Sequence, residues 1–557
     1  MHRTLAIVVI AVTVAVGLPA FAELQNVQVG GSIRIRGNYW TSPAGPDSAT
    51  ARNPLFQWPL TPSFAGVGGN PLRFLRWGAQ PGRLQVTSPV DWNDSGHGMK
   101  IVEQRTKINV KADFSDQVSA FIELDSYDWW GRDFRSNYLT GIDGPANTAD
   151  DVEVYQAYVE ANEMFGYPLR LRIGRQELKF GSGWLLGTND AGSWFRGLSY
   201  DAIRATYATD VFSLDAVAAK LREVGPVEED GDVDMYVLYG SYLGLEDITL
   251  DAYWILVRDA RSQGVDRDGL SRANDTNLGL IGEWVEDVLG VDDYDVTNLH
   301  TVGLRGAGAL GAFKVEAEAA YQFGDASAVG RQFAGAALIS GSPYGDDDAE
   351  FDEWAANVQV AYAFDTDYAP SVFLGGSYYG GEDNRDITFW EWIAANWCPF
   401  WSADASMGFN RLFSDWQYGQ FVASDNHDCT NLWLVYGGIS VMPTESLTAV
   451  LSAAYVSSLD DYDITWPVFW ILGNRITPLA QYSWISQTND DHLCTELMLS
   501  LTYNYSEDLT FEAGYSHLFL GDGAAAGNFN LRNGLGFEGG TGDDDADYFY
   551  LETKLCF

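Results

Sequence analysis

Apolar and polar side chains alternate in many segments of this chain, and this alternation limits the folds that are open to it. In residues 311 to 323, one face carries Phe313, Val315, Ala317, Ala319, Tyr321 and Phe323, and the other carries Lys314, Glu316, Glu318 and Gln322. Successive side chains of a β-strand point to opposite faces, so this segment is predicted to be a strand with one apolar and one polar face. Such a strand fits the boundary between lipid and water.

The same alternation predicts about 18 strands. They lie near residues 27 to 40, 99 to 113, 117 to 129, 152 to 162, 168 to 176, 200 to 208, 210 to 221, 233 to 243, 246 to 258, 298 to 308, 311 to 323, 353 to 364, 370 to 380, 431 to 441, 447 to 457, 492 to 504, 508 to 520 and 547 to 557. Long and short connections alternate strictly, which a soluble β-sandwich would not require. The pattern predicts an all-β, antiparallel, up-and-down transmembrane β-barrel with long extracellular loops and short periplasmic turns. The stretch 275 to 288 is assigned to a loop, as a short helix, because a nineteenth strand would break the parity.

The two ends of the chain predict export to the cell outer membrane. A basic start, an apolar run and the A-x-A sequence ending at Ala22 indicate a signal peptide over residues 1 to 22, followed by a single barrel domain over 23 to 557. No other segment reaches the roughly 18 consecutive apolar residues of a membrane-spanning helix. Phe557 closes an alternating strand and resembles the signal that the barrel-assembly machinery reads. Lipid and that machinery are therefore predicted partners.

Composition supports a membrane barrel, because 14% of residues are aromatic and interfacial girdles of barrels use aromatic residues. The net charge is −44, and a strongly acidic chain disfavours nucleic acid as a partner. The acidic runs fall in predicted outer loops: residues 228 to 230, 292 to 293, 346 to 348 and 543 to 545. They fit a solvated loop surface, with bridging divalent cations as the alternative, although no EF-hand spacing is present.

Four cysteines stand outside any haem-attachment or paired zinc-binding motif, so neither a metal nor a cofactor is predicted. Cys398 and Cys429 lie in one long loop, and their pairing is left open.

Basic residues occupy the predicted lumen face of several strands. They are Arg34, Arg36, Arg105, Lys107, Lys111, Arg170, Arg172, Arg204 and Arg305. Acidic residues occupy it in others: Glu123, Asp125, Glu316, Glu318, Glu512 and Glu552. Two interpretations are open, a track for an anionic solute and internal ion pairs that hold the barrel wall.

Several blocks resemble the alginate export porin family of outer-membrane barrels. They are residues 171 to 178 (LRIGRQEL), 194 to 204 (WFRGLSYDAIR), 409 to 413 (FNRLF) with Tyr418-Gly419, and Thr495-Glu496-Leu497 leading to Tyr515-Ser516-His517 and Gly521-Asp522. The resemblance covers the chain from about residue 100 onwards. It implies an 18-stranded barrel whose arginine-rich lumen passes an anionic polysaccharide.

By this resemblance, Arg172, Arg175, Arg196, Asp201 and Arg204 are candidates for the selective part of the pore. Alternation points Arg175 towards lipid, so it qualifies only if Gly174 forms a bulge. The strongly acidic loops depart from the family pattern and leave alginate itself open.

The predicted function is a passive channel for anionic solutes, including acidic polysaccharides or oligosaccharides. An enzyme is not predicted, because none of the histidines stands in a nucleophile motif and His517 fits an interfacial girdle. The alternative is a non-conducting surface or scaffold barrel, adhesin-like or a sheath for a periplasmic partner.

Overall fold

The computed structural model describes fourteen parts of the chain. They are residues 25 to 40, 99 to 131, 152 to 188, 190, 197 to 223, 232 to 260, 296 to 325, 349 to 381, 405 to 420, 431 to 459, 485 to 486, 491 to 522, 529 to 530 and 545 to 557. Among them, no helix is long and apolar enough to cross a membrane.

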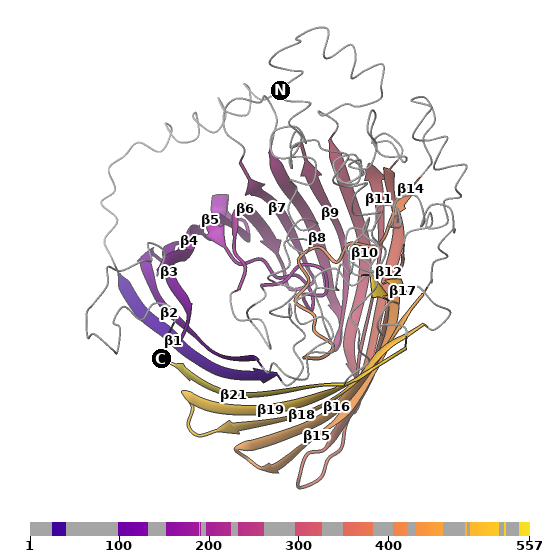
Figure 1. The fold of residues 1–557 in the computed structure, drawn as a ribbon. Helices are drawn as coiled ribbons and strands as arrows, with labels where there is room; N and C mark the ends of the chain where they lie inside the picture. Colours follow the sequence, from indigo (N-terminus) through magenta and orange to yellow (C-terminus); the bar gives the residue numbers. More distant parts are fainter. Residues whose placement is uncertain are drawn as a thin grey trace, which may run out of the picture.

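Long β-strands make up most of the described chain (Figure 1). They are β1 (Asn26–Trp40), β2 (Met99–Ser115), β3 (Val118–Trp129), β4 (Glu153–Ala161), β5 (Leu169–Gln176), β6 (Tyr200–Ala208), β7 (Phe212–Arg222), β8 (Val233–Leu245), β9 (Ile248–Asp259), β10 (Thr297–Leu310), β11 (Phe313–Asp325), β12 (Ala349–Ala363), β13 (Ser371–Tyr379), β15 (Leu432–Thr444), β16 (Leu447–Ser458), β18 (His492–Asn504), β19 (Leu509–Leu520) and β21 (Ala546–Cys556). Three short strands, β14 (Ala405–Met407), β17 (Ile485–Ser486) and β20 (Phe529–Asn530), lie in the connections, together with the 3-10 turn η2 (Met164–Gly166).

The long strands form one closed barrel. Each pairs antiparallel with the next along the chain, and β1 pairs with both β2 and β21. Nineteen strands share the sheet. One of them, β14, pairs only in parallel with the start of β12, so 18 antiparallel strands make the wall. The backbone of Phe557 exchanges hydrogen bonds with that of Gly31 at 2.8 and 3.0 Å. Closure leaves no sheet edge for lipid to meet, as a spanning barrel requires.

The two faces of the wall differ as the alternation predicts. Outward side chains are large, apolar and exposed, as at Val29, Ile108, Leu304 and Leu374. Aromatic groups stack on the outer face near the strand ends, for example Trp354 on Tyr378, with ring centroids 4.3 Å apart. This exterior is suited to contact with membrane lipid.

The 18 predicted strands are confirmed, each within a few residues of its predicted bounds. His517 lies on the outer face beside Phe519, with ring centroids 4.3 Å apart, as expected for a girdle residue. Ser516 points inward and is fully buried. The signal peptide, the stretch 275 to 288, Cys398, Cys429 and the acidic runs, Asp545 excepted, lie outside the described residues. Recognition of Phe557 by the assembly machinery stays a prediction.

Candidate functional site: a charged lumen with two inner segments

Two connections fold into the barrel. We call residues 177 to 188, after β5, the first lumen segment, and residues 408 to 420, before β15, the second lumen segment (Figure 1). Trp184 of the first segment is fully buried, and its indole N–H donates to the hydroxyl of Tyr379 on β13 at 2.7 Å. Phe180 stacks on Tyr239 of β8, with ring centroids 4.9 Å apart. Inward-facing aromatic residues of the wall therefore hold the first segment.

The second segment is held by the same side of the barrel. The backbone N–H of Asn410 donates to the side-chain oxygen of Gln322 on β11 at 2.7 Å. The guanidinium of Arg411 is almost fully buried and lies 5.2 and 5.6 Å from the ring centroids of Tyr379 and Tyr418. These cation–π contacts help to compensate the cost of burying the charge.

The two lumen segments also pair with each other. Gly187 N donates to Phe413 O at 2.9 Å, and Phe413 N donates to Leu185 O at 2.9 Å. Lys179 Nζ lies 2.7 Å from an oxygen of Asp415. Together, the segments form one packed unit inside the barrel, which narrows the lumen.

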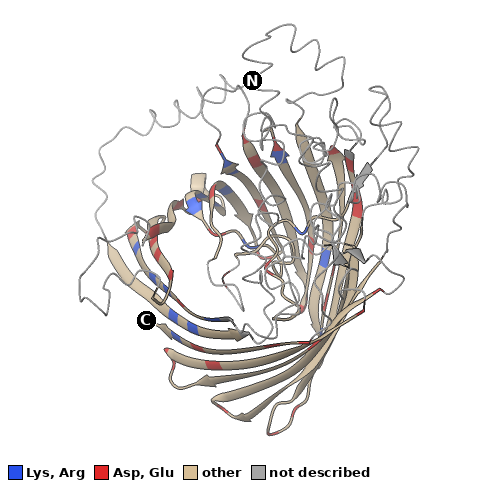
Figure 2. Ribbon diagram, in the orientation of Figure 1, with Lys and Arg blue, Asp and Glu red and all other residues tan. Residues whose placement is uncertain are grey.

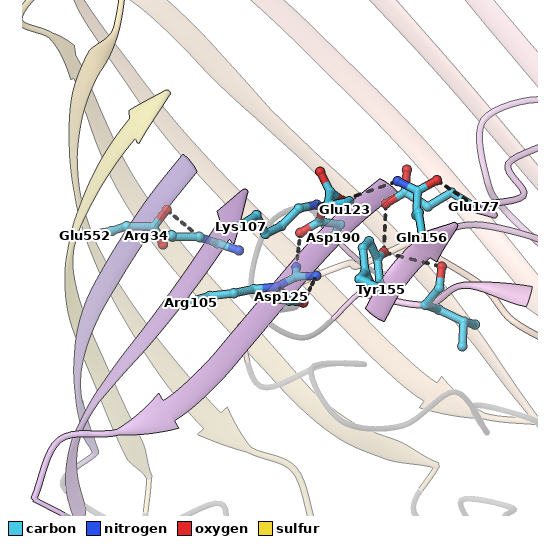
Figure 3. A network of polar contacts seen from close by, with 11 residues as sticks. Arg34, Arg105, Lys107, Glu123, Asp125, Tyr155, Gln156, Glu177, Asp190 and Glu552 are labelled. Atoms are coloured by element: carbon cyan, nitrogen blue, oxygen red, sulfur yellow. Dashed lines mark hydrogen bonds and ion pairs between the residues drawn. The ribbon is translucent and has the colours of Figure 1, made fainter. Parts of the chain in front are cut away.

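A charged row crosses strands β21, β1, β2 and β3 on the lumen face (Figures 2 and 3). Arg34 and Arg105 stand directly opposite each other on β1 and β2. Arg34 lies 2.7 Å from Glu552 on one side, and Arg105 lies 2.7 Å from Asp125 on the other. Directly opposed like charges are destabilising in a sheet, so the flanking carboxylates are needed to hold the two arginines together.

The pattern repeats on the next four strands, β4 to β7. Arg172 and Arg204 stand opposite each other on β5 and β6. Glu160 lies 2.6 Å from Arg172, and Asp215 lies 2.8 Å from Arg204. Eight consecutive strands thus carry two rows in the order carboxylate, arginine, arginine, carboxylate. We call strands β21 and β1 to β7 the ion-paired wall.

The structure places nine of the predicted lumen cations on the inner face. One of them, Arg170, donates to Thr206 at 3.4 Å and interacts electrostatically with the Glu160 carboxylate. Further ion pairs of these cations within the wall include Arg36 with Glu552, Lys107 with Glu123, Lys111 with Asp113, and Arg305 with Asp251 and Glu316. The acidic residues predicted to face inward also do so, several of them as these partners. The basic wall predicted in the N-terminal part of the barrel therefore carries its own carboxylates.

Two residues implied by the family resemblance do not face the lumen. The pairing of β4, β5 and β6 continues without a register shift through Gly174, so no bulge forms there. Arg175 consequently shares the outer face with Ile173, and Asp201 shares it with Ile203. The two form a bidentate ion pair at 2.9 and 2.8 Å. The assignment of Arg175 and Asp201 to the pore was wrong, and Arg196 lies outside the described residues.

Tyr155 is a lumen residue that alternation does not reveal. The register of β3 and β4 shifts between Glu123 and Leu124, a bulge that turns the adjacent residues Tyr155 and Gln156 both inward. The Tyr155 ring lies 5.0 Å from the Arg105 guanidinium and 4.7 Å from the Lys107 ammonium. An aromatic face beside two cations stabilises both.

Asp190 and Glu177 are two further residues that sequence reasoning missed, because they lie in a connection without periodicity. Asp190 contacts Arg105, and its Oδ2 accepts from Lys107 Nζ at 2.8 Å (Figure 3). Glu177 accepts from the Tyr155 hydroxyl at 2.7 Å. Burial raises the pKa of the Glu177 carboxyl above its ordinary value, although the Tyr155 hydrogen bond opposes the rise.

A closed antiparallel barrel with an apolar exterior, a charged lumen and inward-folded connections is a porin-type channel of the outer membrane. A family model described as "Alginate export" matches residues 93 to 533, most of the chain. The chain therefore belongs to the alginate export family.

Among curated proteins, none matches significantly. Solved structures similar to this chain include OccK8 (OprE) of Pseudomonas aeruginosa, 12% identical, which covers 95% of this chain and 98% of its own with a TM-score of 0.44. OccAB3 of Acinetobacter baumannii is 10% identical, with coverages of 95% and 99% and a TM-score of 0.44. An anion-selective porin from Comamonas acidovorans is 8% identical, with coverages of 96% and 99% and a TM-score of 0.36.

Proposed function

We propose that this protein is a passive channel for anionic solutes, among them acidic oligosaccharides or polysaccharides. The observation that carries the proposal is the unequal exposure of the two partners in the lumen ion pairs. The family, whose description names alginate export, supports the same class of solute. No bond is made or broken in this function.

In most of these pairs, the cation is the more exposed partner. The side chain of Lys179 is 47% exposed and that of Asp415 is 4% exposed. The values for Lys111 and Asp113 are 46% and 26%, and those for Arg172 and Glu160 are 21% and 15%. In these pairs, a solute in the lumen meets the positive group first. The pairs Arg305–Glu316, Arg36–Glu552 and Arg105–Asp125 are exceptions, because in them the carboxylate is the more exposed partner.

The lumen segments bring a passing solute close to the exposed cations. They occupy part of the lumen, so a solute must pass within a short distance of the wall. At physiological ionic strength, salt largely screens the interaction between charges that lie more than about 8 Å apart. A narrow passage keeps a solute closer to the wall charges than this distance. Exposed ammonium and guanidinium groups then lower the electrostatic barrier for an anion.

Reversal potentials across planar bilayers test the proposal. With the purified barrel and a tenfold gradient of potassium chloride, the expected sign is that of anion selectivity. The substitution Lys179→Gln should reduce the anion-to-cation permeability ratio about twofold or more, since it removes an exposed lumen cation. Glu445→Gln, in the turn between β15 and β16, is the matched control and should leave the ratio unchanged. Cation selectivity of the natural protein would remove the proposal.

The packing of the two lumen segments also fits a second function, a scaffold barrel that does not conduct. Trp184, Phe409 and Arg411 of these segments are almost completely buried, as in a permanent plug. Single-channel recording separates the two functions. Discrete conductance steps support the channel, whereas a silent, correctly inserted barrel supports the scaffold.

A further inference from the structure

Among the described lumen ion pairs, Asp190 shows the largest reversal of the exposure pattern. Asp190 is 26% exposed, whereas its partner Arg105 is 2% exposed. The second partner of Asp190, Lys107, is 14% exposed. Here the carboxylate, rather than the cation, faces the open lumen. Asp190 therefore covers two cations that the wall would otherwise present to a solute.

The two cations are held in place without Asp190. Arg105 is fixed by Asp125 at 2.7 Å, and Lys107 lies 3.2 Å from Glu123 (Figure 3). The Tyr155 ring lies against both. Without the Asp190 carboxylate, the guanidinium of Arg105 and the ammonium of Lys107 would consequently keep their positions and point towards the same place. Two such donors side by side can bind a carboxylate.

The described ends of the connection that carries Asp190, at Thr188 and at Gly197 and Leu198, lie close together. The backbone N–H of Leu198 donates to the carbonyl oxygen of Thr188 at 2.6 Å. This hydrogen bond joins the two ends of the connection. Gly197 has a φ of +74°, and a Cβ there would lie 2.4 Å from the Tyr155 hydroxyl and 2.7 Å from Arg105 Nη2. Only glycine fits at position 197. The backbone there therefore lies directly against Tyr155 and Arg105.

We propose that Arg105 and Lys107 form a carboxylate-binding subsite of the pathway and that Asp190 occupies it as a displaceable internal ligand. The ligand class is a sugar acid, whose carboxylate takes the place of the Asp190 carboxylate. The inference rests on the proposed function, because it names a subsite for the anionic solute. In the absence of that solute, Asp190 neutralises the subsite and keeps small inorganic anions from being trapped there.

If this is so, the Asp190 carboxylate competes with the carboxylate of the solute for Arg105 and Lys107. Removal of the Asp190 charge should abolish this competition. A site that is free only part of the time binds an added ligand with an apparent affinity reduced by that fraction. Glucuronate is the probe, and its block of single-channel current gives the half-blocking concentration. Asp190→Asn should lower that concentration about tenfold, which corresponds to a site vacant about one tenth of the time in the natural protein. Glucose, which has the same ring without a charge, should block neither protein.

Asp367→Asn, in the turn between β12 and β13, is the matched control and should behave as the natural protein does. Arg105→Gln added to Asp190→Asn should abolish the gain. Asp190→Ser provides a second variant, and heat-modifiable migration on gels checks that each barrel has folded. Equal glucuronate block in the natural protein and both Asp190 variants, or no block in any of them, overturns the subsite. Cation selectivity of the natural protein instead overturns the proposed function, which separates the two failures.

Discussion

The two sides of the lumen solve the problem of buried polar groups differently. The ion-paired wall uses arginine and carboxylate side chains in rows. The opposite side, on β12, β13 and β15, uses neutral groups: Asn357 Oδ1 accepts from Ser377 at 2.7 Å and from Tyr436 at 3.2 Å. Tyr418 of the second lumen segment donates to Ser377 at 2.8 Å. We call this second set the neutral wall.

The difference between the two walls indicates that they have different roles. Neutral hydroxyl and amide groups need only one or two partners, so the neutral wall can be fully covered by the lumen segments at modest cost. Charged groups are expensive to bury completely, and the ion-paired wall keeps several of its cations partly exposed to the lumen. Both walls contact the inner segments, the ion-paired wall through Tyr200 against Phe413 and Arg204 against Phe180, but only the ion-paired wall also leaves cations exposed to a solute.

The largest effect is expected from breaking the ion-paired wall at its most buried cation. Arg105→Met leaves the carboxylates of Asp125 and Asp190 beside an apolar group. The free energy of unfolding should fall by about 3–5 kcal/mol, the usual cost of removing one partner of a buried pair. Urea unfolding in lipid vesicles, followed by tryptophan fluorescence, measures it.

A double variant controls this result. Arg105→Met together with Asp125→Leu removes both buried charges and should recover part of the loss, because apolar replacement of a whole pair is often neutral. If the free energy of unfolding of Arg105→Met fell by less than about 1 kcal/mol, the ion pairs of this row would contribute no more than exposed surface pairs do.

The strands of both walls were predictable from the sequence, whereas their ion pairs were not. Alternation is a local pattern, and it placed Arg34 and Glu552 on the lumen face separately. Their contact joins residues 518 positions apart and depends on how the last strand meets the first. The register that brings Arg34 opposite Arg105 could not be predicted either, because no tight turn joins β1 to β2: residues 41 to 98 separate them.

The lumen segments carry no periodicity, so nothing in the local pattern predicted their inward course. The signals came from the family resemblance, whose blocks from Phe409 to Phe413 and at Tyr418-Gly419 lie in the second lumen segment and whose block 171 to 178 reaches into the first. Arg175 shows the opposite case. Alternation pointed it towards lipid, the resemblance suggested the pore, and the local pattern proved right because β5 keeps its register through Gly174.

An intermediate effect is expected from the neutral wall. Asn357→Leu leaves the hydroxyls of Ser377 and Tyr436 without their shared acceptor in a buried setting. The expected loss of unfolding free energy is about 1–3 kcal/mol, less than at Arg105 because no charge is stranded. Ser377→Ala removes one of these donors and should cost less than Asn357→Leu in the same urea titration. A loss at Asn357 as large as that at Arg105 would contradict the distinction between the walls.

The smallest effect is expected at the ion pair that faces outward from the same strands. Arg175 and Asp201 are 44% and 56% exposed, so solvent or headgroups screen their attraction. A double-mutant cycle with Arg175→Gln and Asp201→Asn should give a coupling energy below about 1 kcal/mol. The matched cycle on the inward pair, with Arg172→Gln and Glu160→Gln, should give a larger value, since both groups are mostly buried beside the Arg204 charge. Equal couplings in the two cycles would mean that facing the lumen adds nothing to the strength of an ion pair in this wall.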